Sequence, residues 1–360
     1  MRIGIVTQPL CANYGGILQN LALQRTLKMM GHEPITLDLS THLNTSKKGY
    51  LRYCASTIVK SLLKGRKIKI LSYNQERRGV FDEFVSQNII TTDRIKSYVP
   101  EIIKKYNLDC IIVGSDQVWR PRYNVYPEDM FLSFASGVNL RKVAYAASFG
   151  TDEWEYTPNL TDKCRKLVTA FNAVSVREES GVKLCEDHLN ITPVLVLDPT
   201  LLHTKEYYNA ISNSVNRSVE RYIAVYTLNI PEYVKDSINE FAKRNEMKVR
   251  LFTSDSGHTL TVEEWISVFR DATFVITDSF HGTAFSIIYE KPFVTLANSS
   301  RGMARFHSLL NQFNLADRLM RLEQPNYELL KKNIDWKDVE RKKECLVNTS
   351  KSFLEQNLSK

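Results

Sequence analysis

The chain has 360 residues, 43% of them hydrophobic and 24% charged, a composition that excludes disordered, collagen-like and low-complexity classes. At about 150 residues per domain, this length predicts roughly two domains. The formal net charge is +8, but the block 47–78 holds ten Lys or Arg against one acid, Glu76, so it carries +9 and the rest of the chain −1. Because the excess is local and no nucleic-acid motif is present, we expect no nucleic-acid partner.

The first half of the chain alternates short apolar runs with helical patterns, which predicts βα units and a parallel sheet. Strands are expected at 2–7, 34–39, 110–113, 143–147, 173–176 and 194–197. Helices are expected at 16–30, 162–171 and 178–188, and residues 40–100 have a helical, basic pattern.

The second half repeats this alternation after a polar, Asn/Ser-rich segment, 205–221, which we expect to be the linker. Strands are expected at 222–226, 249–253, 274–277 and 293–296. Helices are expected at 231–245, 262–270 and 281–289, and polar helices from about residue 327 onward.

We therefore predict an α/β protein with two Rossmann-like parallel-sheet domains that face a cleft, where such sheets bind their ligands. The N-terminal domain is expected at 1–204, with a basic helical insertion at about 45–90. The C-terminal domain is expected at 221–323, followed by C-terminal helices at 324–360.

Cysteines and the chain start indicate a cytoplasmic protein. None of the six cysteines forms a CxxC pair, which favours reduced thiols over disulfides or a zinc site. The first ten residues resemble a strand rather than a signal peptide, and no apolar run reaches the ~18 residues of a transmembrane helix. No Walker A, HExxH or EF-hand pattern predicts a nucleotide or metal site.

Four polar clusters fall where predicted strands turn into helices. The first is Asn13, Tyr14, Gly15 and Gly16, where paired glycines allow a ligand close to the backbone at a helix N-terminus. The alternative is a tight turn that needs positive φ.

The second cluster follows the strand 110–113. Asp116 would accept a proton from a sugar hydroxyl, and Trp119 would offer a flat face for a sugar ring. The alternative is that Asp116 caps a helix and Trp119 belongs to the core.

The third cluster is centred on Arg177, which follows the strand 173–176 and opens a helix. A guanidinium there can hold a carboxylate or a phosphate with two hydrogen bonds. The alternative is a salt bridge with Glu178 or Glu179.

The fourth cluster is the most informative, because backbone donors, hydroxyls and an imidazole converge at one helix start, which suits an anion. Its members are Ser279, His281, Gly282 and Thr283. His281 could donate a proton to a leaving oxygen or to a carbon, or be structural. Downstream, Arg301 and Arg305 lie four residues apart and could clamp a phosphate, or be ordinary solvated arginines.

The basic block contains an apolar stripe, Leu51, Ala55, Ile58 and Leu62, flanked by cationic positions. This pattern is typical of an amphipathic helix on an anionic membrane surface. The alternative is a helix that packs on its own domain with a solvated basic edge.

Together these stretches resemble the polysaccharide pyruvyl transferase family. The matching runs, in order from residue 13 to about 310, are NYGGILQNLALQ, DCIIVGSDQVW, AYAASFG, SVREESGVKL, LDPTLL, TFVITDSFHGTAFSIIYEKPFV and RGMARFHSLL. The resemblance implies a fold like that of two-lobed glycosyltransferases. It also implies transfer of a carboxyethylidene group from phosphoenolpyruvate to two hydroxyls of one sugar, with a ketal and phosphate as products.

By position, Arg177 and His281 match the family's phosphoenolpyruvate-binding Arg and its active-site His, and Asp116 matches an acidic residue of the first lobe. Many members place an Arg two residues before the His, where this chain has Ser279. The second cationic contact would then come from Arg301 or Arg305. The resemblance implies Asp116 as base, His281 as acid or phosphate partner, and no redox or nucleotide cofactor.

Three functions remain open at this point. The first is a ketal-forming pyruvyl transferase for a cell-surface glycan precursor such as a capsule or exopolysaccharide unit, with a lipid-linked sugar as acceptor and possible membrane contact through 47–78. The second is a nucleotide-sugar glycosyltransferase on the same scaffold, and the third is a non-catalytic glycan-binding protein.

Overall fold

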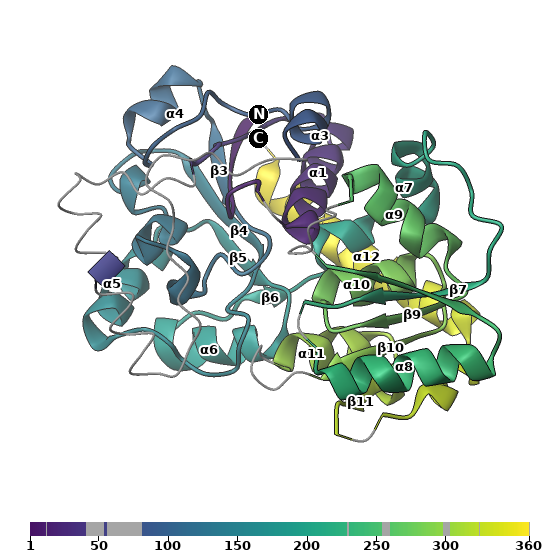
Figure 1. The fold of residues 1–360 in the computed structure, drawn as a ribbon. Helices are drawn as coiled ribbons and strands as arrows, with labels where there is room; N and C mark the ends of the chain where they lie inside the picture. Colours follow the sequence, from purple (N-terminus) through teal and green to yellow (C-terminus); the bar gives the residue numbers. More distant parts are fainter. Residues whose placement is uncertain are drawn as a thin grey trace.

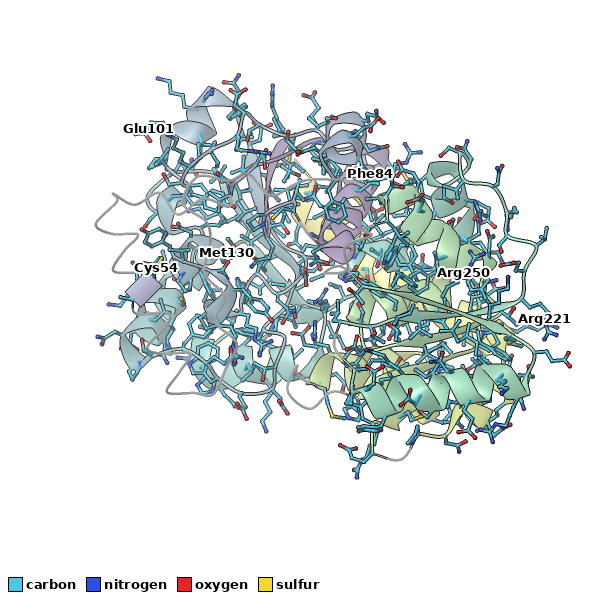
Figure 2. All side chains as sticks on the ribbon, viewed as in Figure 1. Cys54, Phe84, Glu101, Met130, Arg221 and Arg250 are labelled. Carbon is cyan, nitrogen blue, oxygen red and sulfur yellow. The ribbon has the colours of Figure 1, made fainter. Side chains whose placement is uncertain are left out.

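The computed structural model describes residues 1–11, 13–40, 54–55, 81–228, 230–253, 260–297, 303–323 and 325–359. Two parallel sheets, one of six strands and one of five, form two lobes that lie side by side (Figure 1). Figure 2 shows Glu101 and Met130 on the first lobe and Arg221 and Arg250 on the second. The predicted fold class, two parallel-sheet α/β units, is confirmed.

The first sheet has the order β2-β1-β3-β4-β5-β6, and all its pairings are parallel. Its strands are β1 Arg2–Val6, β2 Glu33–Thr36, β3 Cys110–Val113, β4 Arg141–Ala147, β5 Ala173–Val176 and β6 Val194–Leu195. The associated helices are α1 Tyr14–Met29, α3 Phe81–Asn88, α4 Glu101–Lys105, α5 Pro158–Val168 and α6 Glu179–Leu189. Apolar runs form the inner strands because helices cover both faces of such a sheet.

The second sheet has the order β11-β10-β9-β7-β8 and is also parallel. Its strands are β7 Tyr222–Tyr226, β8 Lys248–Phe252, β9 Phe274–Thr277, β10 Phe293–Ala297 and β11 Leu319–Arg321. Its helices are α8 Glu232–Arg244, α9 Val262–Asp271, α10 Phe280–Ile288 and α11 Ala304–Gln312. The short edge strand β11 was not predicted, because three residues are too few to show a period.

The segment predicted as a linker begins with a helix instead. Helix α7, Lys205–Ile211, occupies the first seven of its seventeen residues, and the Tyr208 side chain there is fully buried. The Tyr208 hydroxyl donates to the Thr200 carbonyl at 2.8 Å, and its ring meets that of Phe285 edge-on at 4.8 Å. Polar composition concealed this helix because only a few of its residues face the protein.

The last helix, α12 Trp336–Leu358, returns from the second lobe to the first (Figure 1). Arg141, at the start of β4, donates to the Asn357 carbonyl at 2.6 Å, and the Leu197 amide donates to Ser350 Oγ at 2.9 Å. Phe353 lies beside Tyr145 with 6.2 Å between ring centres. Helix α12 therefore ties the C-terminal part of the chain to the first sheet.

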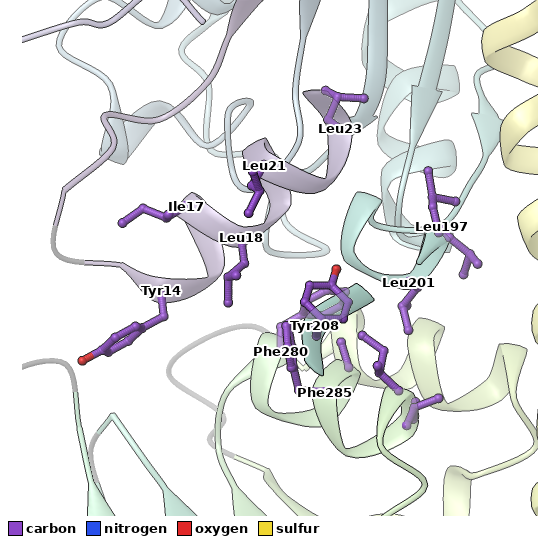
Figure 3. Close-up of a cluster of buried hydrophobic side chains, with 14 of the residues drawn as sticks. Tyr14, Ile17, Leu18, Leu21, Leu23, Leu197, Leu201, Tyr208, Phe280 and Phe285 are labelled. Atoms are coloured by element: carbon purple, nitrogen blue, oxygen red, sulfur yellow. The ribbon is translucent and has the colours of Figure 1, made fainter. Parts of the chain in front are cut away.

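One hydrophobic cluster is shared by both lobes. Tyr14 of α1 stacks on Trp265 of α9 with 5.5 Å between ring centres, and its hydroxyl donates to the Leu260 carbonyl at 2.6 Å. Figure 3 shows Leu18 of α1 on the side of the helix that faces Phe280 and Phe285 of α10. The start of α1 is therefore packed against the second lobe.

Within the described residues, no helix has both the length and the apolar character needed to cross a membrane. The predicted basic amphipathic helix of the block 47–78 lies outside the described residues, apart from positions 54 and 55.

Candidate active site

The C-terminal ends of three strands in the first sheet meet the N-terminus of one helix in the second lobe. Asp116 follows β3, Arg177 follows β5, and Asp198 follows β6, while His281 lies in the first turn of α10. Parallel strands end at the same sheet edge, which brings residues far apart in sequence together. All four side chains are at least nine-tenths buried.

Arg177 is the centre of this cluster. Its Nη1 donates to Asp198 Oδ2 at 2.7 Å and its Nη2 to Asp116 Oδ1 at 3.1 Å, while its Nε lies 3.6 Å from Glu178 Oε2. Burial opposes its charge, but the three carboxylates outweigh burial and raise the pKa of Arg177. The salt bridge to Glu178, which the sequence offered as the alternative to anion binding, is present. The two aspartates lie closer to the guanidinium than Glu178 does.

Asp116 occupies a left-handed backbone conformation with φ of 71°, which Asp tolerates better than most residues. Its Oδ2 accepts a hydrogen bond from Asn13 Nδ2 at 3.2 Å. Burial would raise its pKa, but the charges of Arg177, His281 and Arg305 lower it below the ordinary value. The alternative in which Asp116 caps a helix is wrong, because the next helical turn begins only at Pro121.

Asp198 is the site residue that sequence reasoning missed. It opens the short turn Pro199–Leu202 and accepts hydrogen bonds from Thr200 and from Ser115 Oγ. The available signal was its place directly after a predicted strand, within the family-like run LDPTLL. Its proximity to Arg177 could not be read from the sequence, because the two lie 21 positions apart.

His281 reaches across from α10 and lies against Gly15 of α1. A Cβ added to Gly15 would stand 1.9 Å from His281 Nδ1, so only glycine fits beneath the imidazole. The predicted close approach at Gly15 is therefore made by His281, from the other lobe. The alternative of a turn with positive φ is wrong, because neither Gly15 nor Gly16 has a positive φ.

The residues around His281 shape the start of α10. Ser279 is its N-cap, and the Ser279 hydroxyl accepts from the Gly282 amide at 3.4 Å. Gly282 is required because a Cβ there would lie 2.2 Å from Thr277 Oγ1. Phe280 lies under the Arg177 guanidinium, with 4.3 Å from Cζ to the ring centre, a cation–π contact between the lobes.

Three of the predicted substrate contacts are buried in the structure. Trp119 is fully buried, stacks on Phe131 with 4.8 Å between ring centres, and donates through Nε1 to the Met130 carbonyl at 2.9 Å. Thr283 is also buried, and its hydroxyl makes hydrogen bonds with the Ser279 carbonyl and Thr295 Oγ1. Tyr14 is buried in the contact with α9 described above. For Trp119, this favours the core alternative.

Arg305, from α11, is the second cation of the site and is 8% exposed. Burial and the nearby charge of Arg177 lower the pKa of Arg305 to about 10. Helix α11 also joins the lobes, because Ser308 Oγ accepts from the Glu179 amide at 3.1 Å. The other predicted clamp residue, Arg301, lies outside the described residues.

This arrangement can bind anions and move protons. The described part of the site holds two guanidiniums, Arg177 and Arg305, and three carboxylates, Asp116, Glu178 and Asp198. An incoming anion must therefore compete with carboxylates for the arginines. The imidazole at the helix start lies where a proton donor could reach such a ligand.

Comparisons with known proteins extend this description. A family model described as polysaccharide pyruvyl transferase matches residues 13–300. The fold is similar to that of UDP-GlcNAc 2-epimerase from Neisseria meningitidis bound to UDP-GlcNAc, with TM-score 0.50, 10% identity and 99% of each chain covered. Another UDP-N-acetylglucosamine 2-epimerase gives TM-score 0.53 and 12% identity, with 99% of this chain and 95% of that chain covered. These likenesses show a shared fold, and no curated protein matched the sequence.

Proposed function

Because the chain belongs to the polysaccharide pyruvyl transferase family, we propose that it transfers a pyruvyl group from phosphoenolpyruvate to two hydroxyls of one sugar. The product is a cyclic ketal on a precursor of a cell-surface polysaccharide, and inorganic phosphate is released. The observation that carries this proposal is the meeting of Arg177 and Arg305 with His281 at one buried site between the lobes.

The donor's two anionic groups, a carboxylate and a phosphate, match this set of residues. A guanidinium binds either group with two parallel hydrogen bonds, and the first turn of α10 adds backbone donors near His281. Arg177 is already engaged by Asp116 and Asp198. Donor binding at Arg177 therefore exchanges at least one of these ion pairs for a contact with the donor.

The reaction divides into proton transfers that the site residues can serve. His281 gives a proton to the methylene carbon of the donor, which creates an oxocarbenium-like centre at the neighbouring carbon. One sugar hydroxyl attacks that centre and passes its proton to His281, which restores the imidazolium. Phosphate then leaves, and the second hydroxyl closes the ketal while its proton passes to the phosphate. The low pKa of Asp116 suits it to orient a hydroxyl and to stabilise positive charge.

The test is release of phosphate from phosphoenolpyruvate in the presence of candidate lipid-linked sugars. We expect His281→Ala to lower kcat by about 10² to 10⁴, the usual contribution of a general acid. We expect Arg177→Lys to raise the KM for the donor, because Lys cannot make the bidentate contact. Unchanged turnover in both variants would contradict the assignment of the site.

Calorimetry separates this proposal from the glycosyltransferase alternative. Binding of UDP-GlcNAc, the ligand of the structurally similar Neisseria meningitidis enzyme, together with no binding of phosphoenolpyruvate, would reverse it. Binding of acceptor without any phosphate release would favour a non-catalytic glycan-binding protein.

A further inference from the structure

Asp198 accepts four hydrogen bonds, more than either of the other carboxylates of the described site. Its Oδ1 accepts from the Thr200 amide at 3.0 Å and from Thr200 Oγ1 at 2.8 Å. Its Oδ2 accepts from Arg177 Nη1 at 2.7 Å and from Ser115 Oγ at 3.2 Å. Both oxygens are thus fixed from three different segments, and the side chain is fully buried.

His281 points at this fixed carboxylate from the other lobe. Its Nε2 lies 3.7 Å from Asp198 Oδ2, is buried, and makes no hydrogen bond. A buried ring nitrogen without a partner is unusual, because it has lost its hydration and gained no hydrogen bond in return. Within the described residues, Asp198 supplies the one carboxylate within 4.0 Å of this imidazole.

The distance of 3.7 Å is about 0.8 Å longer than a hydrogen bond of the usual ~2.9 Å. Hydrogen bonds between catalytic groups are often long in the free protein and shorten when substrate binds. The contacts at Gly15 and Phe280 place the imidazole between the lobes, so a small movement of α10 towards the first sheet would close the gap.

We propose that Asp198 is a positioning residue for His281: it accepts a hydrogen bond from Nε2 across the two lobes and thereby fixes the tautomer and orientation of the imidazole. A proton held on Nε2 leaves Nδ1, which lies against Gly15, unprotonated in the neutral ring. For its activity this inference rests on the proposed function, but the pairing itself can be tested without it.

The pairing has a consequence that a purely structural aspartate would not have. A carboxylate can only accept a hydrogen bond, so it requires the proton on the ring nitrogen that faces it. The side-chain amide introduced by Asp198→Asn can donate as well as accept, and it no longer selects one tautomer. We therefore expect Asp198→Asn to lose the preference for a proton on Nε2.

Nuclear magnetic resonance of the full-length protein with ¹⁵N-labelled histidine tests this directly. The chain has seven histidines, and the signals of His281 are identified as those that disappear in His281→Gln. We expect the neutral ring of the unsubstituted protein to carry its proton on Nε2, and Asp198→Asn to lose this preference. A neutral ring protonated on Nδ1 in the unsubstituted protein would overturn the proposal even if the variant does not fold.

Thr200→Val is the matched control, because it removes one hydrogen bond to Oδ1 and leaves Oδ2 facing His281. We expect this control to keep the proton of the neutral ring on Nε2, and an equal loss of that preference in both variants would show that Asp198 acts only through the turn. If phosphate release is absent while the Nε2 pairing is present, the proposed function fails and this inference stands. If phosphate is released and the pairing is absent, this inference alone fails.

Discussion

The imidazole of His281 lies directly over Gly15, so closely that a Cβ at position 15 would be 1.9 Å from Nδ1. One of these residues belongs to the first helix of the first lobe and the other to the helix after β9 in the second. Gly15 thus provides the space that the His281 imidazole occupies. Its substitution should lower activity more than it lowers the free energy of unfolding.

We expect Gly15→Ala to lower kcat for phosphate release by at least tenfold, because the methyl group must push the imidazole away from Asp198. Gly16→Ala is the neighbouring comparison, since its added Cβ would meet Asn13 Nδ2 at 3.2 Å and not the imidazole. We expect this second variant to lose less activity. Equal activity losses in the two variants, at equal thermal stability, would show that the contact with His281 is unimportant.

Replacement of Trp119 should reveal a core residue rather than a sugar platform. We expect Trp119→Ala to reduce the free energy of unfolding by about 3–5 kcal/mol, as for other buried aromatic side chains, or to prevent folding. Tyr126→Ala is the control, because this nearby ring is 57% exposed and its loss should change stability by about 0.5 kcal/mol or less. Urea denaturation measures the free energy of unfolding of both variants. If Trp119→Ala kept its stability but raised the KM for acceptor, Trp119 would instead be a contact for the sugar ring.

His203 should make the stability of the protein depend on pH. Burial lowers its pKa to about 4, opposed by the Ala22 carbonyl and assisted by Lys351, Arg25 and Lys343. Between pH 4 and its ordinary value near 6.5, the unfolded chain binds the extra proton, so stability falls as the pH is lowered through this range. The shift corresponds to about 3 kcal/mol at roughly 1.4 kcal/mol per unit.

We expect His203→Gln to be less stable at pH 7, because Gln replaces a ring that contacts the Ala22 carbonyl and Thr26 at about 3 Å. Its free energy of unfolding should depend less on pH between 4 and 6.5 than that of the unsubstituted protein. Denaturant titrations at several pH values measure this difference, and parallel curves for the two proteins would refute it.

Arg305 should act on the donor through its charge. We expect Arg305→Met to raise the KM for phosphoenolpyruvate at least tenfold with a smaller effect on the KM for acceptor. Arg305→Lys, which keeps the charge but not the fork of donors, should fall between this variant and the unsubstituted protein. A donor KM that is the same in all three proteins would assign donor binding elsewhere.

We propose that the basic block 47–78 binds an anionic membrane surface through its charge. Cosedimentation with vesicles that contain anionic lipid should fall as salt is raised, because salt screens exposed charges. It should also fall when Lys60, Lys64, Arg66 and Lys67 are neutralised. Binding that is insensitive to both changes, or no binding to vesicles at all, would contradict this role.

Most of the strands and helices could be predicted, because the pattern of apolar residues along the chain reflects which of them are buried. Strands β3, β5, β7 and β9 occur at the predicted residues, since continuous apolar runs suit strands covered by helices on both faces. Where burial is carried by few residues, as in α7 and β11, the pattern was too weak. For Trp119 the sequence left a sugar-facing ring and a core position as alternatives, because residue type does not reveal which way a side chain faces, and the structure places the ring in the core.

The sequence by itself determined which residue types stand at the ends of strands and the starts of helices, because these depend on neighbours in the chain. It therefore identified Asp116, Arg177 and His281 one at a time. Only the tertiary structure decided that Arg177 pairs with Asp116 and Asp198, and that His281 crosses from the second lobe to Gly15. Those contacts depend on strand order and on the packing of α1 against α10, and both are set by interactions between residues far apart in sequence.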